Sequence, residues 1–290
     1  MNMAKRVLFP LLPVVAVLGA LALSSCVSRP VAPQDQTRQT LRSLPGSATV
    51  GSAQYVFADA PVANGYPNSW TVLVSVGYES AYDETFKNPA WVAYHISGVP
   101  IWDPGSKRPP YRTDERSTSL VSSKDYPPGY DVGHMACNET IGQFFGSDGQ
   151  RSTFLMTNMV PQRHGLNAGP WKSVETEERT DWVTTYHDLW TIAGPVYTNA
   201  PDEPVNPAMR YGVKQICIPV ACFKIVVARD SAGAVHAVAY IMPQEHASGH
   251  KPKEFAVSIR EVERRTGLNF FSGLPVAVQD RIELEVNKEL

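Results

Sequence analysis

The stretch that decides the fold runs from Tyr126 to Glu139 and reads YPPGYDVGHMACNE. A Pro-Pro-Gly turn precedes an acid, a glycine and a histidine, which are Asp131, Gly133 and His134. These residues alone do not show whether His134 is a reactive base or an ordinary imidazole at the end of a strand. The answer depends on what the rest of the chain places around the histidine.

The first residues of the chain are typical of a secretory leader. Residues 1–25 contain a short basic start, an apolar run from Val7 to Leu23 and no acidic residue. This pattern predicts a signal peptide rather than a spanning helix. The run ends in Leu-Ser-Ser-Cys, which resembles a bacterial lipobox, and ordinary cleavage in the same small-residue stretch is the alternative. We therefore expect Cys26 to carry a lipid that anchors the protein in the cell envelope, at the outer membrane and facing the periplasm.

Composition divides the remaining chain into a tether and one domain. Residues 26–54 are rich in Ser, Thr, Pro, Gln and Arg and have few large apolar side chains, so they are expected to form a flexible tether. Residues 55–290 are long enough for one sizeable domain. Without the two basic residues of the leader, 24 basic side chains remain against 28 acidic ones. Nucleic-acid-binding proteins are usually basic, so any affinity for phosphate must come from a local cluster or a bound cation.

Short runs of β-branched and aromatic residues predict strands. They lie at 70–76, 90–96, 153–159, 189–192, 223–228 and 235–242. The third run is expected to stop at Pro161, and helices are expected from Trp171 to about Tyr186 and over residues 257–266. A proline suits the first position of a helix, where its missing N–H has no partner in any case, so Pro170 fits the start of the long helix. Because strands and helices do not alternate regularly, the sequence predicts an α+β fold with a largely antiparallel sheet.

A second stretch, residues 158–179, reads NMVPQRHGLNAGPWKSVETEER. Together with the box at 131–134, it resembles the DNA/RNA non-specific endonuclease family. In that family an Asp-Arg-Gly-His box is followed by Asn-x-x-Pro-Gln, Leu-Asn-x-Gly-x-Trp and Glu-x-x-x-Arg. Weaker similarity extends over most of residues 65–275. The resemblance implies the ββα-metal (His-Me finger) nuclease fold, with a central, mainly antiparallel sheet flanked by helices. It also implies a metal-dependent endonuclease that hydrolyses phosphodiester bonds of DNA and RNA.

Three residues of these motifs are candidates for the chemistry. His134 is the candidate general base, because an unperturbed imidazole with a pKa of about 6.5 is mostly neutral at neutral pH. Asp131 is expected to have a structural role in the box rather than to contact the imidazole. Asn167 is either the N-cap of the long helix or, as the resemblance implies, the protein ligand to Mg²⁺, with Mn²⁺ or another divalent ion as alternatives. A magnesium ion held by one protein oxygen keeps most of its waters.

Helix geometry limits the roles of the Glu-x-x-x-Arg pair. Glu175 follows Asn167 by eight residues, which is about 12 Å along a helix axis. The two side chains are therefore not expected to bind one ion together, and Glu175 is expected to act through a water on the metal. Arg179 follows at the i+4 spacing. Three roles are open for it: it holds Glu175 in place, it contacts a substrate phosphate, or it forms only a surface salt bridge.

The box departs from the family pattern at its second residue, where Val132 replaces the usual arginine. That arginine lies near the scissile phosphate in the family, so its loss removes a charge-assisted contact. Arg112, which aligns better than Arg108, is expected to supply the missing positive charge. The alternatives to an active nuclease are a catalytically weakened, nucleic-acid-binding envelope lipoprotein and a phosphodiesterase for another substrate.

The cysteines after the leader allow two interpretations. Cys217 and Cys222 frame a four-residue segment, and in an oxidising compartment they form either a short-loop disulfide or two unpaired core thiols. Cys137 lies three residues beyond the candidate base and is expected to be buried and inert.

Overall fold

The computed structural model of the protein describes residues 54–105 and 107–290. The expected leader, Cys26 and all but the last residue of the tether lie outside these residues. Within the described ranges, no helix is both long enough and apolar enough to cross a bilayer.

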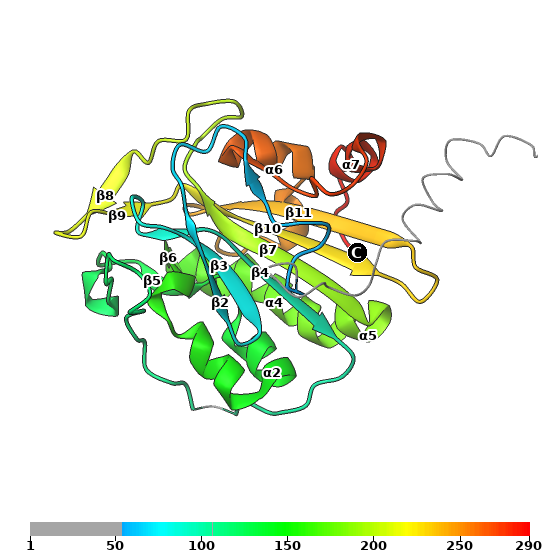
Figure 1. Ribbon diagram of the computed structural model, residues 1–290, viewed down its shortest axis with the longest axis horizontal. Helices are drawn as coiled ribbons and strands as arrows, with labels where there is room; N and C mark the ends of the chain where they lie inside the picture. Colours follow the sequence, from blue (N-terminus) through cyan, green and yellow to red (C-terminus); the bar gives the residue numbers. More distant parts are fainter. Residues whose placement is uncertain (1–53, 106) are drawn as a thin grey trace, which may run out of the picture.

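A seven-stranded sheet forms the centre of the molecule (Figure 1). Its strand order is β12-β11-β10-β7-β4-β3-β2, and every neighbouring pair is antiparallel. The strands are β2 (Thr71–Ser75), β3 (Tyr78–Asp83), β4 (Asn88–Ser97), β7 (Asp188–Val196), β10 (Ala221–Arg229), β11 (Val235–Pro243) and β12 (Ala256–Val257). This sheet confirms the predicted α+β class.

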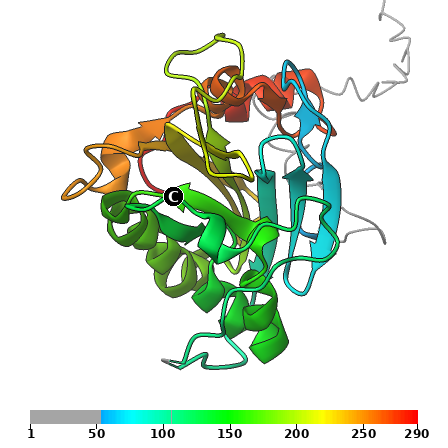
Figure 2. The same cartoon turned by 90° about the vertical axis from the view of Figure 1, so that its left-hand side faces the viewer.

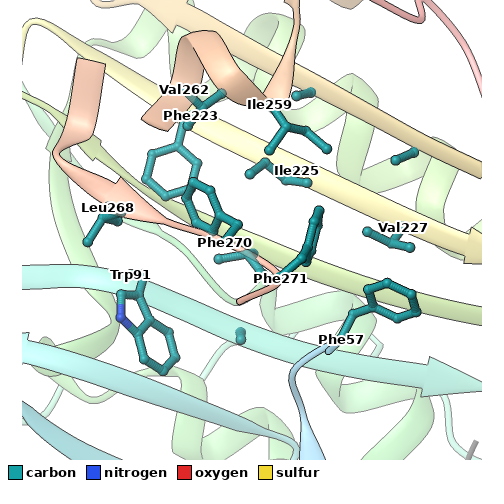
Figure 3. Packing of buried hydrophobic residues seen from close by; sticks show 14 of the residues in the cluster. Phe57, Trp91, Phe223, Ile225, Val227, Ile259, Val262, Leu268, Phe270 and Phe271 are labelled. Carbon is teal, nitrogen blue, oxygen red and sulfur yellow. The ribbon is translucent and has the colours of Figure 1, made fainter. Parts of the chain in front are cut away.

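Both faces of the sheet are buried. Side chains alternate between the two faces of a strand. On β10, Phe223 and Ile225 belong to the hydrophobic cluster on one face, and Cys222 and Val226 belong to the cluster on the other. Figure 3 shows the first cluster, in which Phe223 and Phe270 pack with their ring centroids 5.7 Å apart. Burial on both faces explains why these strands are nearly continuous apolar runs.

Helices α6 (Ile259–Thr266) and α7 (Val276–Glu283) cover the face of the first cluster (Figures 1 and 2). Ser258 caps α6 by accepting a hydrogen bond from the backbone N–H of Glu261 at 3.1 Å. The predicted helix over 257–266 is confirmed with a slightly later start, because β12 pairs with β11 immediately before it.

The opposite face carries α2 (Asn138–Thr153) and a helical run over residues 164–186. The run comprises α3 (His164–Leu166), the π-helix η4 (Asn167–Trp171), α4 (Lys172–Glu177), the π-helix η5 (Glu178–Trp182) and α5 (Val183–Tyr186). It begins earlier than predicted and breaks at Gly169, which has φ −98° and ψ −118°. Pro170 is the first residue after this break, where its missing N–H costs little.

A separate hairpin, β5 (Asp131–His134) with β6 (Met159–Gln162), completes the ββα unit that the resemblance implies. The predicted strand at 153–159 is wrong: Thr153 ends α2, a 3₁₀ turn follows, and β6 begins where that strand was expected to end. Pro161 lies inside β6 rather than stopping a strand. The hairpin has only two strands, so each has an open edge, and an edge strand tolerates proline.

The remaining short elements connect these parts. They are β1 (Val62–Ala63) with β13 (Leu268–Asn269), β8 (Met209–Tyr211) with β9 (Ile216–Ile218), and the 3₁₀ helices η2 (Ser123–Asp125), η3 (Met156–Asn158) and η6 (Pro252–Phe255). The cysteines of the described chain, Cys137, Cys217 and Cys222, are buried and unpaired, so the structure has the core thiols rather than the short-loop disulfide. Burial raises the pKa of Cys137 to about 12, which agrees with an inert thiol.

Candidate active site

A cavity of about 510 Å³ opens beside the β5 hairpin, the start of α2 and the helical run after β6. Asp131, His134, Asn167, Glu175 and Arg179 all line it. The structure therefore brings together five of the six candidate site residues of the domain. The sixth, the arginine at position 112, is not among the lining residues.

His134 ends β5 with only 7% of its surface exposed. Its ring packs edge-on against Phe154, with centroids 4.9 Å apart, and lies near Tyr111. Its Nε2 atom is buried without a hydrogen-bond partner in the described chain. Burial, with a smaller contribution from the charge of Arg108, lowers the pKa of His134 to about 3. The ring is therefore neutral near pH 7 and able to accept a proton.

Two residues of the second stretch hold the backbone at this histidine and just after it. Trp171 donates its indole N–H to the carbonyl of His134 at 3.2 Å. The Asn158 amide accepts from the N–H of Ala136 at 2.8 Å and donates to the carbonyl of the same residue at 3.0 Å. These contacts give Asn158 and Trp171 a structural role and fix the direction in which the chain leaves β5.

Gly133 is required at its position by a close approach across the hairpin. A Cβ atom at Gly133 would lie 2.0 Å from Oε1 of Gln162, a residue that is fully buried. The Asp-x-Gly-His and Pro-Gln motifs thus lie on the paired strands β5 and β6 and pack against each other.

Asn167 lies inside the helical run, with φ −60° and ψ −48°, so the N-cap interpretation is wrong. The run begins three residues earlier, which leaves no helix end for Asn167 to cap. Its Nδ2 donates to Oδ2 of Asp131 at 2.9 Å. The same carboxylate oxygen pairs with Nδ1 of His164 at 2.9 Å. Asp131 therefore orients Asn167 rather than the imidazole of His134, and it leaves the Oδ1 of the amide available to a cation.

Glu175 reaches the cavity from α4 with 12% of its side chain exposed. Its Oε1 is buried without a hydrogen-bond partner in the part of the chain described, and Nζ of Lys224 lies 3.8 Å away. Burial raises the pKa of Glu175, and the charge of Lys224 opposes that rise. Lys224 was missed from the sequence; its only signal there is a charged residue within an apolar strand.

Arg179 does not hold the carboxylate of Glu175. Its guanidinium pairs with Glu139 of α2 at 2.7 Å and donates to the backbone carbonyl of Glu175 at 2.7 Å. The i+4 spacing brings the two residues together, but through the helix backbone. Arg179 also lines the cavity.

The two candidate arginines lie in different places in the structure. The backbone of Arg112 forms an isolated β-bridge with Leu155. Its guanidinium donates to the carbonyl of Arg151 at 3.1 Å, and Arg112 is not among the residues that line the cavity. Arg108 lines the cavity, with its guanidinium 5.4 Å from the centre of the Phe154 ring. Val132 lines the cavity too, so Arg108 supplies positive charge close to the departure from the family box.

The donors in the cavity fit a hard cation that keeps most of its water. No group of three or more His, Cys, Asp or Glu side chains suited to a metal occurs in residues 54–105 and 107–290. The cavity instead offers the amide oxygen of Asn167, and the side chain of Glu175 also lines it. Oxygen donors in small number are what Mg²⁺ commonly uses in proteins.

Comparisons with known proteins agree with this geometry. Residues 60–277 match the family model described as DNA/RNA non-specific endonuclease. The mitochondrial nuclease EXOG of Danio rerio is 29% identical over 205 residues, which are 67% of this chain and 59% of that protein. The human EXOG nuclease is 29% identical over 67% of this chain and 55% of its own length. This chain thus spans somewhat more than half the length of these relatives.

A bacterial relative and a solved structure are covered more completely. The nuclease of Serratia marcescens is 29% identical over 233 residues, which are 75% of this chain and 82% of that protein. The crystal structure of an EndoG/EndoGI complex superposes with a TM-score of 0.63 at 26% identity. That superposition covers 76% of this chain and 91% of the solved one.

Proposed function

The chain belongs to the DNA/RNA non-specific endonuclease family, and from this premise we propose that it is a metal-dependent endonuclease that hydrolyses phosphodiester bonds of DNA and RNA. One observation carries the proposal: a neutral imidazole, an oriented amide oxygen and the carboxylate of Glu175 line the same cavity. In-line hydrolysis of a phosphodiester needs a base for the water and positive charge for the phosphate. The cavity supplies the base from its own residues and offers oxygen donors for a cation that would provide the positive charge.

The residues divide the work as follows. His134 takes the proton from the attacking water. Its pKa is low in the free protein, and the negative charge of an incoming phosphate raises the pKa and so makes the imidazole a stronger base. The Oδ1 of Asn167 would hold the cation, which when bound stabilises the charge on the phosphoryl and leaving oxygens. Glu175 would accept hydrogen bonds from the water around that ion.

The basic residues of the cavity bind and orient the substrate. Arg108, Lys172 and Arg179 line the cavity and offer charge-assisted hydrogen bonds to phosphate oxygens. Arg179 must exchange Glu139 for the phosphate, since the two side chains are paired in the structure. This arrangement supports binding through the phosphate backbone, which carries no base sequence.

The proposal is tested by incubating the purified protein with supercoiled plasmid and with RNA, in Mg²⁺ and in a chelator. We expect both substrates to be cut only with the divalent ion, and the new ends to carry 5′-phosphates. Asn167→Ala should raise the Mg²⁺ concentration needed for half-maximal activity far more than Glu175→Ala, because Asn167 would touch the ion directly and Glu175 only through a water. Binding of DNA without turnover at any metal concentration would instead identify a catalytically weakened binding protein.

We propose, from the sequence, that the mature protein is a lipoprotein tethered through Cys26 to the outer membrane and facing the periplasm. The basic start, apolar run and Leu-Ser-Ser-Cys ending support this location. In a Gram-negative host, Cys26→Ser should move the protein from the membrane fraction to the soluble fraction or block its maturation. An unchanged membrane fraction would contradict the anchor.

A further inference from the structure

A lysine lies buried beneath the floor of the active site. Lys224 is in the middle of β10, and none of its side-chain surface is exposed. It shares the face of the strand with Cys222 and Val226, which is the face that packs against the helical layer of the cavity. Lysine is almost never fully buried unless its charge is compensated.

Three groups surround the ammonium of Lys224. Oε1 of Glu175 is 3.8 Å from Nζ, Oε1 of Glu178 is 3.6 Å away, and the ring centre of Trp171 is 4.5 Å away. Nζ has no hydrogen-bond partner among the described residues. These distances exceed those of hydrogen bonds, so the ammonium interacts with both carboxylates through its charge and with the indole through a cation–π contact.

The two glutamates do not depend on the lysine equally. Glu178 is fully buried, and its carboxylate accepts hydrogen bonds from the hydroxyls of Tyr94 at 2.5 Å and Thr191 at 3.3 Å. Glu175 faces the cavity, and its Oε1 has no such donor in the described chain. The nearest compensating charge for Glu175 inside the fold is the ammonium of Lys224.

We propose that Lys224 is a positioning residue for catalysis, which holds the carboxylate of Glu175 at the cavity without itself lining the cavity. The inference rests on the proposed function, because it assigns Lys224 to the metal side of that same site. The ammonium also lies against Trp171, whose indole N–H fixes the carbonyl of His134.

The first test is Lys224→Met, which keeps the length of the side chain and removes its charge. We expect kcat/KM to fall by about 10- to 100-fold, the range found when outer-shell partners of metal sites are removed, and the Mg²⁺ concentration for half-maximal activity to rise no more than it does in Glu175→Ala. Mn²⁺ affinity measured by titration calorimetry should fall in the same direction. The melting temperature should fall as well, because two buried glutamates lose their counter-charge.

A second variant separates positioning from stability. Lys224→Met with Glu178→Gln removes the second buried charge together with the first. We expect its melting temperature to recover towards the wild-type value while kcat/KM and Mn²⁺ affinity stay low. Recovery of all three would overturn the proposal, because Lys224 would then serve only to neutralise Glu178.

A double variant tests whether Lys224 acts through Glu175, and a variant of another charged residue on the same strand is the control. Lys224→Met combined with Glu175→Gln should be no less active than Glu175→Gln alone, because the lysine acts through that carboxylate; an additional loss of about tenfold would contradict this. Arg229→Met is the matched control, since Arg229 lies on the same strand in an ion pair with Asp188 and away from the cavity, and its activity and Mn²⁺ affinity should not change. If the wild type cuts neither DNA nor RNA, the proposed function fails, while the Mn²⁺ titration still tests Lys224.

Discussion

Two neighbours of different kinds determine the protonation state of the His134 imidazole. The ring is buried against Phe154, and the charge of Arg108 lies close by. Burial disfavours the charged form of a histidine, and a nearby positive charge disfavours it further. The pKa of His134 accordingly falls to about 3, so the imidazole is unprotonated over most of the accessible pH range.

This low pKa makes the stability of the protein depend on pH in a defined direction. The unfolded chain binds the proton of His134 with a pKa of about 6.5, whereas the folded protein binds it only near pH 3. The contribution to stability is therefore fully present above about pH 6.5 and is lost as the pH falls towards the folded value. Between pH 7 and pH 5 the wild type should lose about 2 kcal/mol more of unfolding free energy than His134→Phe. Urea unfolding of both proteins at the two pH values measures this difference, and equal losses would contradict a buried neutral imidazole.

The two arginines of the segment before the hairpin make a second residue-level test. Arg108 lines the cavity, and Arg112 is engaged with a backbone carbonyl elsewhere. Arg108→Met should lower kcat/KM on plasmid DNA by about 10²-fold, the scale of one lost electrostatic contact to a transition state. Arg112→Met is the matched control and should cost little. Equal losses in the two variants would return Arg112 to the role that the sequence favoured.

At the scale of elements, the β5 hairpin aligns the catalytic box with the helical run. Gly133 lies diagonally across the ladder from Gln162, and a Cβ atom at Gly133 would collide with this buried side chain. The helical run that carries Asn167 and Glu175 begins directly after β6, the second strand of the hairpin. Packing within this small ladder thus helps to set the distance between His134 and Asn167.

Gly133→Ala should destabilise the protein by about 1–3 kcal/mol, the usual cost of forcing extra volume into a packed site. Because the clash is with Gln162, the double variant with Gln162→Ala should lose less stability than the sum of the two single variants. Thermal unfolding of the three variants measures this coupling. Strict additivity would show that the close approach is not what requires the glycine.

The sequence predicted elements well where composition and burial agree. The central strands β4, β10 and β11 are apolar runs that are buried on both faces, and they were found. Strand β3 was missed because its sequence, YESAYD, is polar although every residue in it is buried. Helix α2 was missed because its glycines weaken any helical pattern; Gly146 has a φ of 76° within it.

The sequence also predicted part of the site but not all of it. Motif order placed His134, Asn167 and Glu175 in one cavity, because those residues lie on neighbouring elements of a single ββα unit. The roles of Glu139 and Lys224 depend on contacts between elements far apart in the chain, which no local pattern records. The same reason explains why the preferred arginine at 112 does not reach the cavity.

At the scale of the whole molecule, the proposed polyanionic substrate would bind in spite of a formal net charge of −2. The cavity concentrates three basic side chains, Arg108, Lys172 and Arg179. Counterion release contributes a slope of about −0.9 per contacted phosphate on B-DNA. We therefore expect log(kcat/KM) on plasmid DNA to fall with log[NaCl] with a slope of about −2 to −3, at constant Mg²⁺. A slope steeper than about −5 would show a basic groove extending well beyond the cavity.

The most direct test of the account is the rate at which excess protein nicks supercoiled plasmid in Mg²⁺, compared between the wild type and His134→Ala. Removing a general base should slow the nicking step by about 10²–10⁴-fold, and adding a chelator should stop the wild type. A variant that nicks at the wild-type rate, or a wild type that is indifferent to the chelator, would contradict a reaction in which His134 takes a proton beside a cation held by Asn167.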